Sequence, residues 1–166
     1  MNEIVLTPLS IIAVILGTVA LVACYIPRIP ASIVAFAALV FAYLGKAGGA
    51  VTGEVLVFWG AATAIVLGLR FLQPRGLLAM RAGTAYISTG SIAGAAIGFA
   101  ISPTTAAVIL GCVAGAFLAL TAYMRTPGSP RLAVASSPFL QYYCAKSFPI
   151  IIAVSMAAIA LSSVLL

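Results

Sequence analysis

The chain contains no histidine, and only two of its 166 residues, Glu3 and Glu54, are acidic. Charged residues make up 6% of the sequence, whereas a soluble domain carries about 25%. Hydrophobic residues make up 64%, and the mean hydropathy is +1.29. So few polar side chains could not cover a globule in water. The composition therefore excludes a soluble globular domain and predicts an all-α, polytopic integral membrane bundle.

The lack of imidazole and the scarcity of carboxylates also narrow the chemistry. General acid–base catalysis, proton relays and sites for hard cations draw mainly on these groups. The sequence contains no P-loop, GxSxG or GxGxxG motif and no spacing typical of metal ligands. We therefore expect a non-enzymatic protein that needs no cofactor and no metal.

Cys24, Cys112 and Cys144 are isolated, and no pair has the CxxC spacing. Two of them lie in apolar runs, where cysteine behaves as a small hydrophobic residue, so we expect neither a disulfide nor a metal site. The sequence Leu21-Val22-Ala23-Cys24 is similar to a bacterial lipobox. The segment Met1-Asn2-Glu3 has no basic residue, however, and we expect no lipid modification at Cys24.

Apolar segments divide the chain, which we treat as one domain over residues 1–166, into spans close to the length of about 20 residues that a bilayer needs. The second span is short, because a helix over residues 31–44 measures about 21 Å against a hydrocarbon core of about 30 Å. We expect six transmembrane helices. The alternative is five, with a re-entrant second segment and the N-terminus inside. We expect residues 139–147, with Lys146, to lie at the membrane interface. The expected spans are residues 4–26, 31–44, 55–72, 87–101, 105–124 and 148–166.

The basic residues are distributed unevenly among the connections. Odd-numbered connections hold seven of the eight, and even-numbered connections hold only Lys46. The positive-inside rule then places the odd connections in the cytoplasm of a bacterial inner membrane, with both termini outside. The net charge of +6 is thus interpreted as orientation and contact with anionic lipid, not as nucleic-acid binding. The seven residues are Arg28, Arg70, Arg75, Arg81, Arg125, Arg131 and Lys146.

Small residues recur at every fourth position in three spans. Residues four apart lie on one helix face, and a stripe of small residues lets two helix backbones approach closely in lipid. A tight turn at Pro103 joins the fourth and fifth spans, so we expect a glycine-zipper hairpin in which the two ladders face each other. The alternatives are an oligomer interface and a pore lining. The ladders are Gly60, Ala64 and Gly68; Gly90, Gly94, Gly98 and Ser102; and Ala107, Gly111, Gly115 and Ala119.

The connection Pro27-Arg28-Ile29-Pro30 is the most unusual one in the chain. Proline interrupts a helix, and backbone groups freed at the bilayer edge must be buried in protein or face water. Arginine matches phosphate bidentately. We therefore predict a structural break at Pro27 and Pro30, and a site for an anionic lipid or a lipid-linked phosphate near Arg28. The predicted lipid- or anion-binding residues are Arg28, Arg75, Arg81, Arg125 and Arg131; the alternative is that these residues serve only orientation and ordinary headgroup contact.

Several segments together carry a family resemblance. They are Ile26-Pro27-Arg28-Ile29-Pro30, the ladder of Gly90, Gly94 and Gly98, Pro103, and residues 108–111 and 115–118. With these segments the chain resembles the small bacterial membrane proteins of the domain-of-unknown-function 456 family. The resemblance implies a helical membrane fold and no particular activity.

Three expected spans precede the connection of residues 70–86, and three follow it. Pro30 leads the second span as Pro103 leads the fifth, which is the layout of inverted halves in many transporters. We interpret the chain as a membrane protein that handles or transports a lipid or small amphiphilic solute. The alternative is an accessory or assembly subunit that docks into an oligomer or a larger membrane complex through its small-residue faces. The expected partners are membrane lipids and membrane proteins, with no nucleic acid.

Overall fold

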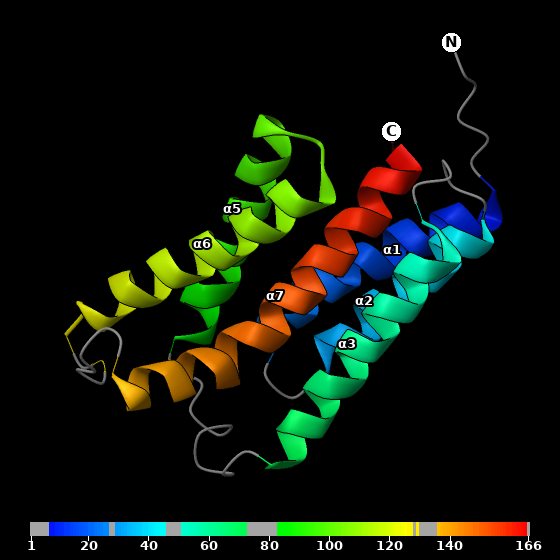
Figure 1. The fold of residues 1–166 in the computed structure, drawn as a ribbon. Coiled ribbons are helices and arrows are strands. Elements are labelled where there is room, and N and C mark those ends of the chain that lie inside the picture. Colours follow the sequence, from blue (N-terminus) through cyan, green and yellow to red (C-terminus); the bar gives the residue numbers. More distant parts are fainter. Residues whose placement is uncertain are drawn as a thin grey trace.

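The computed structural model describes residues 7–26, 29–45, 51–72, 83–127, 129 and 136–165, and among these residues it contains helices and no strand. Three helices, α5, α6 and α7, are long and apolar enough to cross a membrane, and shorter apolar helices accompany them. The prediction of an all-α fold is confirmed, and the apolar helices fit a membrane protein. The helices are α1 (Pro8–Ala23), α2 (Ala31–Leu44), α3 (Gly53–Leu72), α5 (Thr84–Ile101), α6 (Thr105–Met124) and α7 (Ser137–Leu165) (Figure 1).

Threonine side chains cap the starts of three helices, α1, α3 and α6. The Thr7 hydroxyl accepts a hydrogen bond from the backbone N–H of Ser10 at 3.3 Å at the start of α1. Before α6, the Thr104 hydroxyl accepts one from the N–H of Ala107 at 3.4 Å. These side chains satisfy donors that the first turn of a helix leaves without a partner. The Thr104 cap therefore allows α6 to begin only a few residues after α5 ends, which makes the turn at Pro103 tight.

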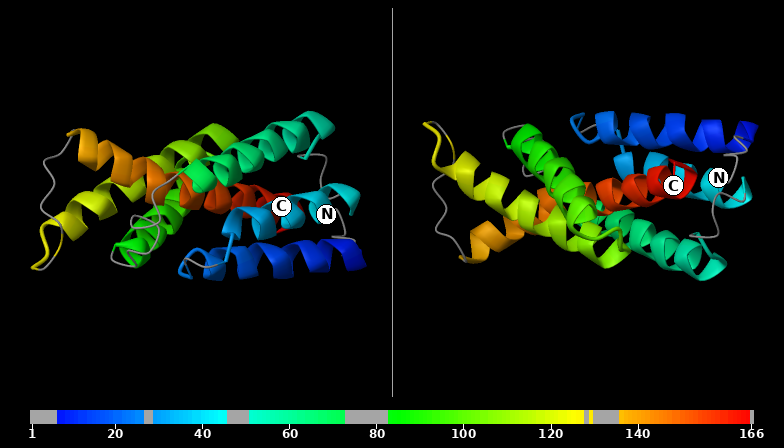
Figure 2. Two further views of the ribbon diagram at one scale, coloured as in Figure 1. Left: turned by 90° about the horizontal axis from the view of Figure 1, so that it is seen from below. Right: turned by 90° about the horizontal axis from the view of Figure 1, so that it is seen from above.

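Helix α7 is the centre of the bundle and packs against each of the other described helices. Its middle is buried on all sides, and Ala153, Met156 and Ala157 have no exposed surface. The remaining helices form two groups, with α1, α2 and α3 on one side of α7 and α5 and α6 on the other (Figure 1 and Figure 2). A helix that is apolar all round fits such a central position.

The helix that contains the last expected span begins before residue 148. Helix α7 begins at Ser137 and continues through Pro149, and Figure 1 shows that it changes direction along its length. A proline removes one helical hydrogen bond and can bend a helix without ending it, provided that neighbouring helices hold both halves. The segment expected at the interface is also more buried than predicted, because Phe139 is 1% and Lys146 is 7% exposed.

Three further boundaries differ from the predicted ones. Helix α1 ends at Ala23, three residues before the proposed limit of its span, and α3 begins at Gly53. Helix α5 begins at Thr84, directly after Gly83, which has a φ of 85°. Glycine adopts this left-handed conformation without steric cost, so the chain can turn sharply into the helix at that point. The polar residues that we assigned to a connection thus form the first turn of α5.

Glycines bring the backbones of α5 and α6 into direct contact. A Cβ atom added to Gly94 would overlap the carbonyl oxygen of Gly111, and one added to Gly111 would overlap that of Gly94. The Ser91 hydroxyl donates a hydrogen bond across this contact to the carbonyl oxygen of Cys112 at 3.3 Å. The two ladders therefore face each other in an antiparallel hairpin. The same close approach occurs at Gly90, Gly98 and Gly115.

The ladder predicted in the third span does not meet another ladder. A Cβ atom at Gly60 would lie 3.3 Å from the ring of Phe36 in α2, and one at Gly68 would meet nothing within 4 Å. Ala64 is exposed. Gly68 therefore has no packing partner among the described residues. A four-residue spacing permits close approach, but it supplies no partner, and the neighbouring α2 presents a ring at Gly60.

Candidate functional site

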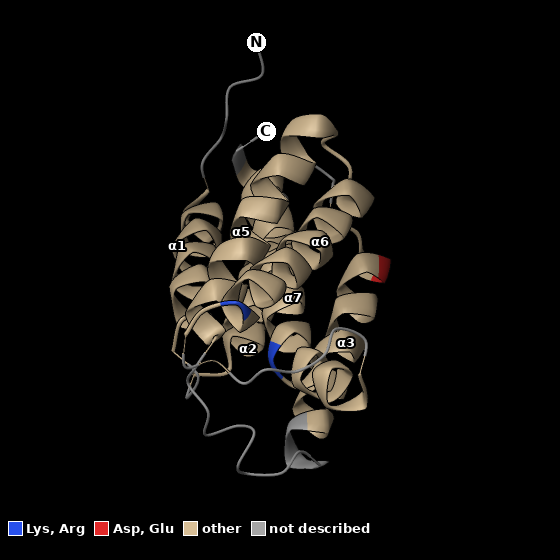
Figure 3. Cartoon of the chain, turned by 90° about the vertical axis from the view of Figure 1, so that its left-hand side faces the viewer, with Lys and Arg blue, Asp and Glu red and all other residues tan. Residues whose placement is uncertain are grey.

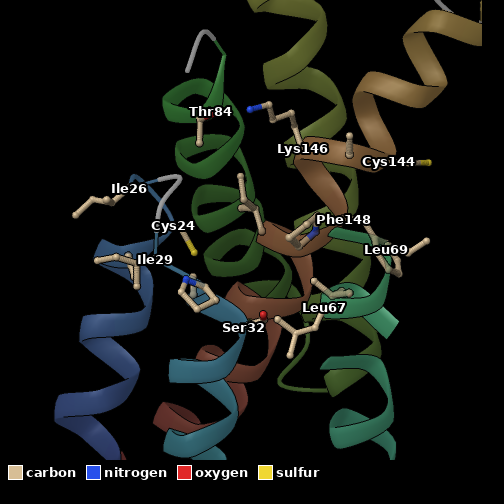
Figure 4. Close-up of a pocket in the computed structure, with 17 residues that line it drawn as sticks. Cys24, Ile26, Ile29, Ser32, Leu67, Leu69, Thr84, Cys144, Lys146 and Phe148 are labelled. Carbon is tan, nitrogen blue, oxygen red and sulfur yellow. The ribbon is translucent and has the colours of Figure 1, made fainter. Parts of the chain in front are cut away.

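A cavity of about 100 Å³ lies where helix ends from both groups meet the bend of α7 (Figure 4). It is bounded by the connection between α1 and α2, the C-terminal part of α3, the start of α5 and the residues of α7 around Pro149. From the connection it receives Ile26, Ile29 and Pro30. These residues flank Arg28, so the cavity lies beside the proline break that the sequence singles out.

Most of the cavity wall is hydrocarbon. Val66 and Leu67 line it from α3, and Phe148 and Ile150 line it from α7. Ile29 completes this wall from the connection between α1 and α2. Ligand sites commonly combine such apolar walls with a few polar groups that fix orientation. The wall therefore fits an alkyl chain better than a polar solute.

Polar side chains line the cavity at two places, with Ser32 of α2 beside the apolar wall and Lys146 and Thr84 at the other end (Figure 4). Lys146 from α7 is 7% exposed and Thr84 from α5 is 6% exposed, and both line the cavity. Figure 4 shows the Lys146 side chain extending towards the start of α5, where Thr84 lies. In the part of the chain that the structure describes, the buried hydroxyl oxygens of Thr84 and Ser147 have no hydrogen-bond partner. A buried polar atom without a partner costs about 1–3 kcal/mol, so the native structure leaves hydrogen-bonding capacity unused here.

Backbone chemistry adds to this polar end. Pro149 has no N–H to donate to the carbonyl of Ala145 four residues earlier, and both residues line the cavity. Gly83 is the N-cap of α5 and provides no side-chain cap hydrogen bond. A Cβ atom at position 83 would lie 2.8 Å from the hydroxyl oxygen of Tyr142. Glycine therefore allows both the positive φ and the close seating of the α5 N-terminus against α7.

Most of the predicted basic site lies outside the described residues. This applies to Arg28, Arg75, Arg81 and Arg131, and also to Pro27. Arg125 is described; it is exposed at the C-cap of α6 and does not line the cavity. Pro30 lines the cavity, whereas Pro103 lies at the turn between α5 and α6.

Lys146 is the cation that the described structure brings to the cavity, although we assigned it to the membrane interface. In Figure 3 the red of the acidic residues lies on α3, apart from the blue of the basic residues. A sequence signal for the position of Lys146 exists. Tyr142, Lys146, Ile150 and Val154 are four residues apart, and this helical face is buried in the structure. A prediction that extended the last helix through Pro149 would have placed Lys146 on this buried face.

Cysteine chemistry and metal binding add little to the site. All three cysteines are free, with Cys24 and Cys112 buried and Cys144 exposed. Cys24 and Cys144 line the cavity. The described residues contain no group of metal-binding side chains. The cavity is therefore lined by hydrocarbon, the Lys146 ammonium group, the hydroxyl groups of Ser32 and Thr84, two thiols and backbone dipoles.

The chain matches no protein-family model, no curated protein and no solved structure. The resemblance to the domain-of-unknown-function 456 family therefore stays a prediction.

Proposed function

We propose that this protein is a multi-pass protein of a bacterial inner membrane that binds a lipid or small amphiphile in the cavity beside Pro149. It handles this molecule without catalysing a reaction on it. The observation that carries the proposal is the cavity itself, which combines an apolar wall with the buried Lys146. An amphiphile has the same two parts, an alkyl chain and a polar head.

The arrangement of the helices supports six crossings. Helix α1 starts and α7 ends at the same end of the bundle, and α2 runs back along α1 (Figure 1). An even number of crossings would produce this arrangement, and the charge distribution would then place both termini outside. In this orientation the cavity faces the cytoplasmic half of the bilayer, where anionic lipids are abundant.

Native mass spectrometry of the full chain from mild detergent tests the proposal, because it reports bound lipid, partners and oligomeric state together. We expect the wild-type protein to retain an amphiphile. Leu67→Trp would fill the cavity from α3 and should abolish this retention. Leu118→Trp is the matched control, since Leu118 lies on the outer face of α6 and is 66% exposed. Equal retention in the two variants, or none in the wild type, would overturn the proposal.

An accessory role in a larger membrane complex is the second candidate. The glycine faces of α5 and α6 cover each other and are not available for docking. Gly68 on α3 is the position that favours this second function, because a Cβ atom there would meet nothing within 4 Å. A partner protein or second copy that remains with the wild type in native mass spectra, and is lost from Gly68→Leu, would support it.

A further inference from the structure

We propose that the polar end of the cavity binds the anionic head, a phosphate or a carboxylate, of a molecule whose alkyl chain lies along the apolar wall. The head would be held by the Lys146 ammonium group, the Thr84 hydroxyl and the first backbone N–H groups of α5. This inference rests on the proposed amphiphile site and names the chemistry of its ligand.

Thr84 provides the first argument. Its side chain is 94% buried, taken as the remainder of its 6% exposure, and its hydroxyl oxygen has no partner among the described residues. Thr84 also lines the cavity. A buried hydroxyl without a partner is rare in native proteins, because water or a ligand normally satisfies it. A ligand oxygen at this end of the cavity would accept the unused Thr84 proton.

The start of α5 provides the second argument. Its first N–H groups have no acceptor within the helix, and its N-cap Gly83 supplies no side chain in their place. The aligned peptide dipoles also give the N-terminus a partial positive charge, which favours an anion. Close contact of Gly83 with Tyr142 and Tyr123 fixes this helix end beside α7. The helix dipole and Lys146 therefore act on the same end of the cavity.

The balance of donors provides the third argument. An ammonium group and backbone N–H groups only donate hydrogen bonds, and a hydroxyl can donate one. Such a set matches oxygen atoms that only accept, as in ionised phosphate and carboxylate. The apolar wall begins next to these donors, with Phe148 and Ile150 in the same turn region of α7 as Lys146. The site therefore selects an anion attached to an alkyl chain.

Lipid titration of the full chain in mild detergent, followed by native mass spectrometry, tests this selectivity. The probes are phosphatidic acid, a long-chain fatty acid, phosphatidylcholine, diacylglycerol and inorganic phosphate. We expect the two anionic amphiphiles to bind about tenfold more tightly than the zwitterionic and neutral lipids, as one charge-assisted contact would give. Inorganic phosphate should not compete, because it lacks the chain.

Three variants assign the selectivity to named side chains. Lys146→Met keeps an unbranched apolar stem and should remove the preference for anionic lipid, and Lys146→Arg should restore it. Thr84→Val keeps the shape of the side chain and should weaken anionic binding by about threefold to tenfold, the value of one hydrogen bond. Arg125→Met is the matched control, since Arg125 is exposed outside the cavity, and should change binding by less than about twofold.

The outcomes separate this inference from the proposed function. If all lipids bind equally in the wild type and in Lys146→Met, the anionic head is refuted and the amphiphile site stands. If inorganic phosphate binds as tightly as phosphatidic acid, the site takes a free anion and the amphiphile proposal is overturned. A loss of anionic binding in Arg125→Met equal to that in Lys146→Met would refute the assignment to the cavity.

Discussion

The helices on one side of α7 pack in a different way from those on the other side. Helices α5 and α6 touch through their backbones, with Gly94 and Gly111 facing each other. In the other group glycines meet flexible side chains. A Cβ atom at Gly17 of α1 would lie 3.2 Å from the side chain of Leu161, and one at Gly60 would lie 3.3 Å from the ring of Phe36. A backbone contact cannot yield, whereas a side chain can change its rotamer.

The position of the cavity follows from this difference. It lies where α5, seated on α7 by Gly83, meets the ends of α1, α2 and α3. Direct bonds between the groups at this level come from side chains, with the Ser88 hydroxyl donating to the Cys24 carbonyl at 2.9 Å and the Tyr25 hydroxyl lying 3.1 Å from that of Thr89. A rigid hairpin beside a more adaptable group can therefore admit a ligand between them.

Gly94→Leu should have the largest effect on stability. A leucine at position 94 would overlap the backbone of α6, which must move away, and we expect a loss of about 3 kcal/mol in unfolding free energy. Thermal unfolding in detergent measures it. Gly68→Leu is the matched control on the other side of α7 and should stay within about 0.5 kcal/mol of wild type. Equal stability of the two variants would show that backbone contact does not hold the hairpin.

Pro149→Ala tests whether the bend of α7 keeps the cavity open between the two groups. Alanine restores the N–H that can bond to the Ala145 carbonyl and should straighten α7. We expect retained amphiphile to fall about tenfold, equivalent to about 1.4 kcal/mol. Native mass spectrometry measures the retention, and Pro103→Ala, outside the cavity, is the control. Unchanged retention in Pro149→Ala would mean that packing of the neighbouring helices alone maintains the cavity.

Thr84→Val, at the junction of the two groups, should change stability and lipid binding in opposite directions. In the ligand-free protein the variant removes a buried hydroxyl that has no hydrogen-bond partner among the described residues, so we expect a gain of about 1 kcal/mol in unfolding free energy. Binding of anionic lipid should weaken at the same time. Thermal unfolding with and without phosphatidic acid measures both. If the ligand-free variant is less stable than wild type, the hydroxyl already has a structural role.

Gly17→Ala should have the smallest effect. The added methyl group meets the side chain of Leu161, which can shift, and alanine favours a helix more than glycine does. We expect a change within about 0.5 kcal/mol in unfolding free energy. Gly111→Ala in the hairpin should instead lose about 2 kcal/mol, because its methyl group meets the backbone of Gly94. Parallel thermal unfolding of both variants decides this, and similar losses would mean that the two groups resist added volume equally.

Local patterns allowed part of the structure to be predicted. The hairpin follows from the glycine spacing and the short turn, because Gly94 and Gly111 lie on helices that are consecutive in the chain. The start of α2 directly after Pro30 was predictable for a similar reason, because a proline disfavours helix in the residue before it. The partner of Gly68 was not predictable, because the same spacing carries no information on what stands opposite. Lys146 was expected at the membrane interface, and its place at the cavity was not predicted because it depends on how α7 packs against α5, a helix distant in the sequence.

The sequence by itself determined that this chain is an apolar helical protein and that the faces of α5 and α6 can touch. These properties depend on composition and on residues a few positions apart. Only the tertiary structure decided where the cavity lies and that Lys146 and Thr84 share it. Those residues come from α7 and α5, and the wall adds residues from α2 and α3. Their meeting depends on how distant helices pack around the bend at Pro149, which no local spacing specifies.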